Sequence, residues 1–277
     1  MNAPALLSVQ GLRKSFGGVQ AVDDVGFELR RGELLAMIGP NGAGKSTCFN
    51  MINGQLAPDA GRVLLHGTDI AGRKPREIWR MGVGRTFQVA ATYGSMTVVE
   101  NVQMALLSHR RELFRFWPRA AAMHRDEALG LLAQVGLADR ADDPCSTLAY
   151  GDIKTVELAV ALANAPKLLL MDEPTAGMAP RERNALMALT RRLVKEMEIG
   201  VLFTEHSMDV VFAHADRIMV LARGQLIAQG TPEAIRADAR VAEVYFGSGK
   251  LVQAGQASRG PGAETRAPGG EAGTANG

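Results

Sequence analysis

The sequence predicts an α/β fold built around a mostly parallel sheet, and two patterns lead to this prediction. Short apolar runs typical of strands alternate with longer stretches in which apolar residues recur at helical spacing. One of these runs, 34–38, is followed directly by a glycine-rich loop and a helix-like segment. Strands that alternate with helices form a parallel sheet that is covered on both faces.

The first quarter of the chain is expected to contain short strands and one helix. Apolar residues alternate over Val25–Leu29, and Gly17 and Gly18 mark a turn before that run. The helix is predicted over Lys45–Ile52, after the glycine-rich loop. The predicted strands of this region are Leu7–Gln10, Val25–Leu29, Leu34–Ile38 and Arg62–His66.

The rest of the chain continues the alternation of helices and strands. Residues 95–136 are polar and helical in pattern, with apolar side chains three and four positions apart. Further helices are predicted over Gly151–Ala163 and Pro180–Met197, and strands over Leu168–Met171, Gly200–Thr204 and Asp216–Ala222. Residues 248–277 are rich in Gly, Ala and Pro and lack periodicity, so this tail is predicted to be disordered.

The most informative segment is the stretch 39–47, Gly-Pro-Asn-Gly-Ala-Gly-Lys-Ser-Thr. It matches G-x-x-x-x-G-K-[ST], a pattern that forms a phosphate cradle when it lies between a strand and a helix. Glycines let the backbone turn its N–H groups inward, where they and the positive end of the helix meet phosphate oxygens. Lys45 adds a positive charge, and Ser46 offers a hydroxyl to Mg²⁺. The residues predicted to bind a nucleotide are Gly39, Pro40, Asn41, Gly42, Ala43, Gly44, Lys45, Ser46 and Thr47.

A second informative segment is an apolar strand that ends in two carboxylates, Asp172 and Glu173. This ending places both side chains at the C-terminal edge of a parallel sheet, where ligands bind in folds of this kind. Asp172 is predicted to hold Mg²⁺, and Glu173 to polarise the water that attacks the γ-phosphate. A strand followed by a solvated acidic turn is the alternative for this pair alone. The phosphate loop upstream favours the catalytic interpretation.

Bulk composition excludes several classes of function. The 31 basic and 29 acidic residues are spread along the chain and give a net charge of +2, so no nucleic-acid partner is expected. Cys48 and Cys145 follow no metal or redox spacing, and Cys48 is expected to be a buried thiol. The N-terminus lacks the pattern of a signal peptide, and no apolar run approaches the ~20 residues of a transmembrane helix. We therefore expect any association with a membrane to be peripheral.

Five segments in this order resemble the motifs of ATP-binding cassette (ABC) ATPases. They are Gly39–Thr47, Gln88 within Arg85–Gln88, Leu148–Gly151, Asp172–Thr175 and His206. The resemblance covers about residues 6–247. It implies a P-loop NTPase core with an N-terminal antiparallel β subdomain, a helical subdomain at about 95–164, and ATP and Mg²⁺ as ligands.

The resemblance also implies roles for single residues. Phe16 is expected to stack on the adenine ring, although a lone aromatic in a strand is more often part of a core. Gln88 is expected to contact Mg²⁺ and the attacking water, and His206 to hydrogen-bond the γ-phosphate. Ala149 and Gly151 belong to a signature segment that opens a helix and binds the γ-phosphate of ATP held by the opposite subunit.

The sequence departs from the family pattern in two segments. In the signature, Ala149, Tyr150 and Asp152 stand where the family usually has Ser, Gly and Gln, and the segment Ala176–Ala179 stands where it usually has Ser-Ala-Leu-Asp, so no carboxylate stands at Ala179. Loss of the serine hydroxyl removes one hydrogen bond, which contributes about 1 kcal/mol net. Function is expected to survive because the backbone donors and Gly151 are retained. Asp152 is expected to point away from the phosphate.

Several segments are similar to the ATPases of bacterial branched-chain amino-acid importers. These segments are Leu148–Gly151, the pair Glu205-His206 followed by Met208-Asp209, Met96–Asn101, a polar insert around 109–124, and Val244–Gly247. Importers of urea, short-chain amides or aromatic acids share most of these features. A lipopolysaccharide-export ATPase and a P-loop kinase fit less well, and so does a DNA-repair or translation cassette protein.

The importer resemblance implies a set of partners and a place in the cell. The partners are integral membrane permease subunits, a second ATPase subunit that is identical or related, and, indirectly, a periplasmic solute-binding protein. The expected location is the cytoplasmic face of the bacterial inner membrane, as a peripheral subunit.

Overall fold

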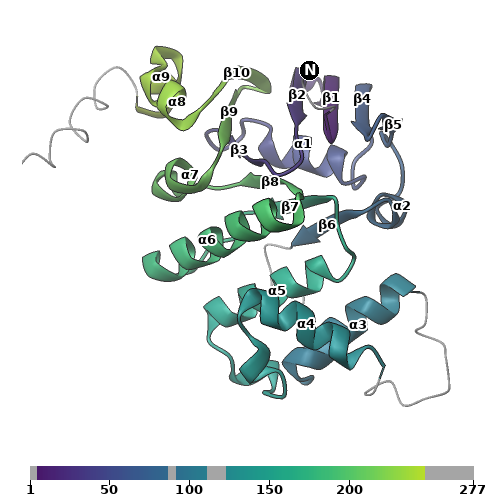
Figure 1. Cartoon of the computed structure of the whole chain (residues 1–277). Coiled ribbons are helices and arrows are strands. Elements are labelled where there is room, and N and C mark those ends of the chain that lie inside the picture. The colour runs from purple at the N-terminus through teal and green to yellow at the C-terminus, as the bar shows by residue number, and fades with distance from the viewer. Residues whose placement is uncertain (1–4, 87–91, 111–122, 247–277) are drawn as a thin grey trace, which may run out of the picture.

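The structure is a computed structural model that describes residues 5–86, 92–110 and 123–246. Gln88, residues 111–122 of the polar insert and the tail 248–277 lie outside the described residues. The fold consists of a central sheet, a smaller N-terminal sheet and helices on both faces of the central sheet (Figure 1).

The central sheet has the strand order β10-β9-β3-β8-β7-β6. All neighbours in it are parallel except β9 and β10, which pair antiparallel. The predicted α/β class with a mostly parallel sheet is therefore confirmed. The strands are β3 (Leu34–Ile38), β6 (Val83–Thr86), β7 (Leu168–Asp172), β8 (Gly200–Thr204), β9 (Arg217–Ala222) and β10 (Gln225–Gly230).

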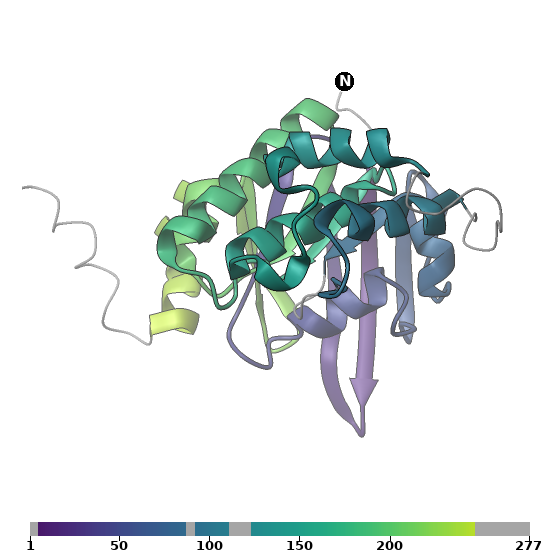
Figure 2. The same cartoon turned by 90° about the horizontal axis from the view of Figure 1, so that it is seen from below.

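The second sheet is antiparallel, with the order β2-β1-β4-β5. Gly17 and Gly18 both have positive φ and form the two-residue turn between its longest strands. Figure 2 shows this hairpin projecting beyond the helices. The strands are β1 (Leu7–Phe16), β2 (Val19–Leu29), β4 (Ala60–Leu65) and β5 (Thr68–Asp69).

Helices cover the central sheet, and three of them, α3, α4 and α5, gather below it in Figure 1. The helices are α1 (Lys45–Ile52), α2 (Pro75–Arg80), α3 (Val98–Arg110), α4 (Arg125–Val135), α5 (Tyr150–Leu162), α6 (Pro180–Met197), α7 (Met208–His214), α8 (Pro232–Ala237) and α9 (Ala239–Phe246). Among the described residues, no helix is long and apolar enough to cross a membrane.

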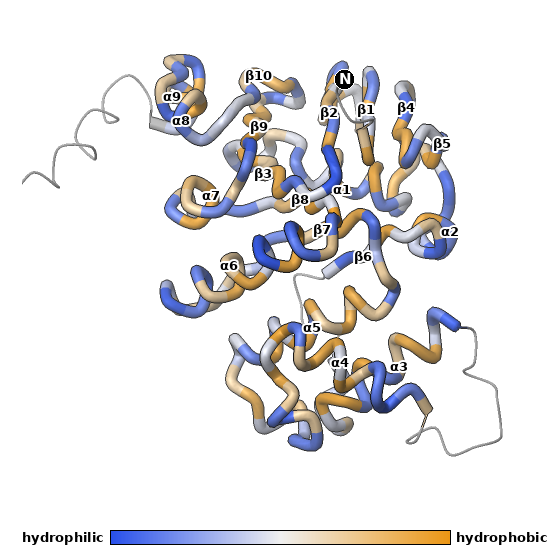
Figure 3. Tube along the Cα trace, viewed as in Figure 1, coloured by the Kyte–Doolittle hydropathy of each residue, from blue (hydrophilic) through white to orange (hydrophobic). Residues whose placement is uncertain are grey.

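Strand β3 shows why the central sheet is buried on both faces. Leu34 and Ile38 belong to a core cluster shared with helices α3 to α7. Leu35 and Met37 point to the opposite face and belong to a second cluster with α1 and the N-terminal sheet. Because side chains alternate along a strand, five consecutive apolar residues fill both cores. Figure 3 shows the hydrophobic residues of the central strands and of α5.

The predicted element boundaries are confirmed for several elements and wrong for others. The helices 45–52 and 180–197 and the strands 34–38 and 200–204 are found as predicted. The predicted end of strand β1 at Gln10 is wrong, since the strand continues to Phe16. Register shifts after Val9 interrupt the alternation of apolar residues, so the sequence pattern ends before the strand does. The prediction missed α2, β5, β6, α7, β10, α8 and α9.

Candidate functional site

The glycine-rich loop joins the end of β3 to the start of α1. Gly44 caps the helix with φ of 99°, in the left-handed region, and a Cβ at this position would lie 2.4 Å from the carbonyl oxygen of Ala21. Only glycine is free of both constraints. The loop therefore leaves a concave backbone surface at the N-terminus of α1, where N–H groups and the helix dipole favour an anion.

Lys45 is a buried cation inside this loop. Its Nζ donates to the carbonyl oxygens of Gly39 at 2.7 Å and Pro40 at 3.2 Å. Burial lowers the pKa of Lys45, whereas the nearby carboxylates of Glu173 and Asp172 raise it. The ammonium group is thus held next to the loop by neutral backbone acceptors, which phosphate oxygens can replace.

Asp172 and Glu173 follow each other at the carboxyl end of β7. Asp172 pairs in register with Thr204 of β8, and its Oδ1 accepts the Thr204 hydroxyl at 2.7 Å. Its Oδ2 lies 3.8 Å from Nη2 of Arg85. Glu173 has φ of 48°, and its amide donates to the carbonyl and hydroxyl oxygens of Thr204, both at 3.1 Å. The hydroxyl of Thr204 thus links the two acidic residues.

Glu173 and His206 face each other across the ends of two neighbouring strands. The Nε2 of His206 lies 2.8 Å from Oε1 of Glu173. His206 follows β8 after one residue, and half of its side chain is exposed. A carboxylate and an imidazole in contact at the rim of a cavity form a pair that can accept and donate protons.

The loop and this pair line one cavity of about 340 Å³. Phe16 also lines it and is 49% exposed, so it is not a core aromatic. Asp172, the last residue of β7, is not among the residues that line the cavity. The lining residues are Phe16, Ala21, Asn41, Gly42, Ala43, Gly44, Lys45, Ser46, Thr47, Glu173 and His206.

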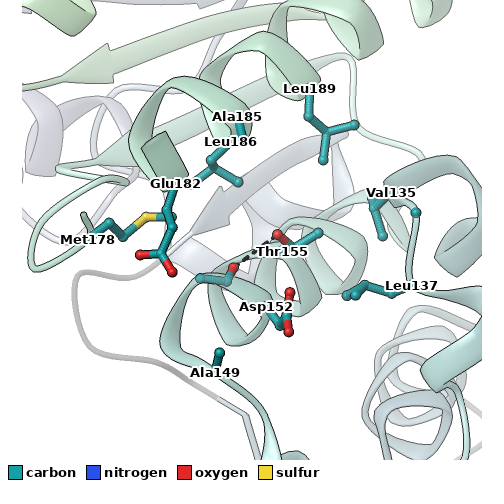
Figure 4. A pocket seen from close by; sticks show the side chains of 12 residues that line it. Val135, Leu137, Ala149, Asp152, Thr155, Met178, Glu182, Ala185, Leu186 and Leu189 are labelled. Atoms are coloured by element: carbon teal, nitrogen blue, oxygen red, sulfur yellow. Dashed lines mark hydrogen bonds between the residues drawn. The ribbon is translucent and has the colours of Figure 1, made fainter. Parts of the chain in front are cut away.

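The predicted signature residues lie elsewhere, beside a second cavity of about 250 Å³ (Figure 4). Ala149 caps α5, and Gly151 lies in its first turn. Asp152 accepts a hydrogen bond from Nη1 of Arg140, so its carboxylate is neutralised locally. The two cavities share no lining residue, so Ala149 and Gly151 do not reach the phosphate loop of their own chain.

The residues present fit a nucleotide and a divalent cation. The loop offers amides and an ammonium group to phosphates, while Ser46 and Asp172 offer oxygen ligands. In the described residues, no cluster of three or more His, Cys, Asp or Glu side chains could hold a metal alone. This donor set suits Mg²⁺, which is usually held by one or two protein oxygens, waters and substrate phosphates.

Sequence reasoning missed polar residues that support this site. Thr204 and Glu205 contact the segment after β7, and Arg85 approaches Asp172. In the sequence, Thr204 stands out only as the end of an apolar strand, and Glu205 only as part of a pattern next to His206. A polar residue at the end of a buried strand is the available signal, because that edge of a parallel sheet binds ligands.

A glycine loop between strand and helix, with Lys45 and Glu173 lining the same cavity, defines a P-loop nucleotide-binding protein. A family model described as "ABC transporter" matches residues 22–176. A second family model, described as "Branched-chain amino acid ATP-binding cassette transporter", matches residues 225–250. The chain belongs to the ATP-binding cassette transporter family and is an ATPase of that family.

Similar proteins carry related names. The high-affinity branched-chain amino acid transport ATP-binding protein LivG of Salmonella typhimurium is 39% identical over 249 residues, covering 87% of this chain and 98% of that protein. BraF of Pseudomonas aeruginosa, with the same description, is 38% identical over 249 residues with the same coverage. The ADP conformation of an ATP-binding cassette of an ABC transporter superposes with a TM-score of 0.79 at 32% identity, covering 88% of this chain and all of that one.

Proposed function

We propose that this chain binds and hydrolyses Mg-ATP as one of two ATPase subunits of an importer for branched-chain amino acids or a similar solute. The observation that supports ATP hydrolysis best is the shared cavity of the phosphate loop, Glu173 and His206. The similarity to LivG and BraF over nearly their whole length supports branched-chain amino acids as the class of transported solute.

The chain's own residues bind and orient ATP in this proposal. Phe16 stacks on the adenine ring, because this exposed aromatic side chain lines the cavity. The amides of the loop and the N-terminus of α1 hold the β- and γ-phosphates. Lys45 turns from the carbonyls of Gly39 and Pro40 to the phosphate oxygens. Ser46, Asp172 and Gln88 would hold Mg²⁺, which when bound would neutralise phosphate charge.

Hydrolysis then uses the pair at the cavity rim. A water attacks the γ-phosphorus, the bond from that phosphorus to the β–γ bridging oxygen breaks, and ADP leaves. Glu173 accepts the proton that the water loses. His206 hydrogen-bonds the γ-phosphate and keeps Glu173 aligned through their 2.8 Å contact. Gln88 orients the attacking water.

A second subunit completes each site in this mechanism. Ala149 and Gly151 of the opposite chain present the N-terminus of α5 to the γ-phosphate, which satisfies the phosphate charge from both sides. The separation of the two cavities within one chain supports this arrangement. The salt bridge from Arg140 keeps the charge of Asp152 away from the phosphate.

Opening and closing of the two subunits drives transport through permease subunits in the membrane. A periplasmic solute-binding protein delivers the solute to those permeases. The chain itself acts as a peripheral subunit at the cytoplasmic face of the bacterial inner membrane. In this proposal no nucleic acid takes part.

Replacing Glu173 by Gln tests the proposed chemistry. The variant is expected to bind ATP normally in calorimetry but to hydrolyse it about 10²- to 10⁴-fold more slowly, the range for loss of a positioned base. Hydrolysis at the parental rate would show that Glu173 is not the base.

Leucine uptake by vesicles that contain the chain with its co-purifying membrane subunits tests the class of transported solute, with urea and an aromatic acid as competing solutes.

A further inference from the structure

Glu205 is a buried carboxylate at the end of β8 that the mechanism above does not use. Glu205 is 3% exposed. Its Oε1 accepts the amide of Thr175 at 2.9 Å and the hydroxyl of Thr175 at 2.6 Å. Its Oε2 accepts the amide of His206 at 3.2 Å. One side chain therefore joins the segment after β7, which contains Thr175, to the segment after β8, which contains His206.

Arg183 of α6 joins the same two segments through other atoms. Its Nε donates to the carbonyl oxygen of Met178 at 2.7 Å, and its Nη1 donates to the hydroxyl of Ser207 at 2.9 Å. The segments 173–179 and 205–207 are thus held together by two independent side chains. Both segments begin at the strand ends that carry the Glu173–His206 pair.

The burial of Glu205 needs a reason beyond the pairing of the strands. A buried carboxylate is costly unless hydrogen bonds satisfy it, and all three donors to Glu205 are uncharged. Strands β7 and β8 already pair through to Asp172 and Thr204. Charge-assisted hydrogen bonds are short and strongly directional. The carboxylate therefore fixes the geometry of the segments beyond the strand ends.

We propose that Glu205 is a positioning residue that holds the His206 segment against the segment after β7. This keeps the imidazole of His206 within hydrogen-bond reach of the Glu173 carboxylate. The inference rests on the proposed function, because it assumes that hydrolysis uses the Glu173–His206 pair. A displacement of about 1 Å in such a pair can lower turnover about 10²-fold.

Two substitutions test this role with little change of shape. In Glu205→Gln, the new NH₂ group must face either the Thr175 amide or the His206 amide, and both of these are donors. Thr175→Val removes only the hydroxyl that Glu205 accepts, whereas Thr175→Ser retains it. Thr190→Val is the matched control, because Thr190 is equally buried and donates its hydroxyl to the carbonyl of Leu186, within α6.

The measurements are kcat and KM for ATP hydrolysis by the full purified chain, together with Tm. Glu205→Gln and Thr175→Val are expected to lower kcat by about tenfold or more, with KM within about threefold. Thr175→Ser is expected to retain kcat within about threefold. Thr190→Val is expected to lower Tm while kcat stays within about twofold.

The inference is overturned if Glu205→Gln and Thr175→Val lower Tm as Thr190→Val does but leave kcat within about twofold of the parent. Should Glu205→Gln fail to fold, Thr175→Val alone decides, because it removes one hydroxyl and no charge. Glu173→Gln, measured in parallel, separates this failure from failure of the proposed function. Parental turnover in Glu173→Gln overturns the proposed function itself. A large loss there, with no loss in the other two variants, overturns only the role of Glu205.

Discussion

Lys45 is a buried cation whose ammonium group donates to two backbone carbonyls, so a phosphate offers it a stronger partner. Lys45→Ala is expected to weaken ATP binding roughly 10- to 100-fold, because hydrogen bonds between charged groups contribute about 1.5–3 kcal/mol. Calorimetry measures this change. Lys195→Ala is the control, since Lys195 also donates to a backbone carbonyl, that of Gly32, but lies away from the cavity. Equal affinity in both variants would contradict the role of Lys45.

Cys48 lies in α1, immediately after the phosphate loop, and is fully buried. Burial raises the pKa of its thiol to about 12, because a low-dielectric surrounding disfavours the thiolate. Since the thiolate is the reactive form, Cys48 is expected to resist iodoacetamide at pH 8 in the folded chain and to react in urea. Mass spectrometry of labelled peptides checks this. Rapid labelling of the folded chain would show that α1 is accessible.

The residues of the site were predictable to the extent that their chemistry is local. The loop 39–47 and the pair Asp172-Glu173 are contiguous motifs, and the structure brings the loop and Glu173 to one cavity. Glu205 was not predictable as a positioning residue, because its partner Thr175 is 30 residues away in the sequence. Arg85 was missed for the same reason, since its contact with Asp172 depends on the pairing of β6 with β7.

The elements show a similar division between local and non-local causes. Helix α6 was predicted from end to end, because Pro180 occupies its first turn and its apolar residues recur at helical spacing. Strand β6 has only four residues, including Gly84, and it is a strand because it pairs with β7. Strand β10 likewise depends on its pairing with β9. A strand that forms only because it pairs with a neighbouring strand has no strong pattern in its own sequence from which it could be predicted.

The junction between the phosphate loop and α1 depends on one glycine. Gly44→Ala forces a side chain into left-handed backbone and against the carbonyl of Ala21. Gly42→Ala is the matched control, because Gly42 also has positive φ, at 78°, but a Cβ added there would have no atom within 4 Å. Gly42→Ala is expected to cost about 1–2 kcal/mol of unfolding free energy, and Gly44→Ala more, since it adds overpacking of about 1–3 kcal/mol. Urea denaturation measures both. Equal costs would contradict the close approach at Gly44.

At the scale of the whole molecule, each of the two cores on opposite faces of the central sheet supports a different cavity. The core with α1 and the N-terminal sheet supports the cavity that contains Phe16 and Lys45. The core with α3 to α7 supports the second cavity, beside the start of α5. The two cavities share no lining residue, and in the arrangement proposed above a nucleotide contacts one cavity from each of two chains.

The chain is longer than LivG, because the aligned residues cover 87% of this chain but 98% of LivG. A chain that stops after residue 249 is therefore expected to keep kcat for ATP hydrolysis within about twofold and Tm unchanged. A chain that stops after Asp238 is the control, because it lacks Val241 and Tyr245, which pack against the core shared with α3 to α7. Losing this apolar contact is expected to lower Tm, by roughly 2–4 °C for each kcal/mol lost. Scanning calorimetry and a phosphate-release assay measure both variants. A large loss of kcat in the longer chain at constant Tm would show that residues 250–277 take part in hydrolysis.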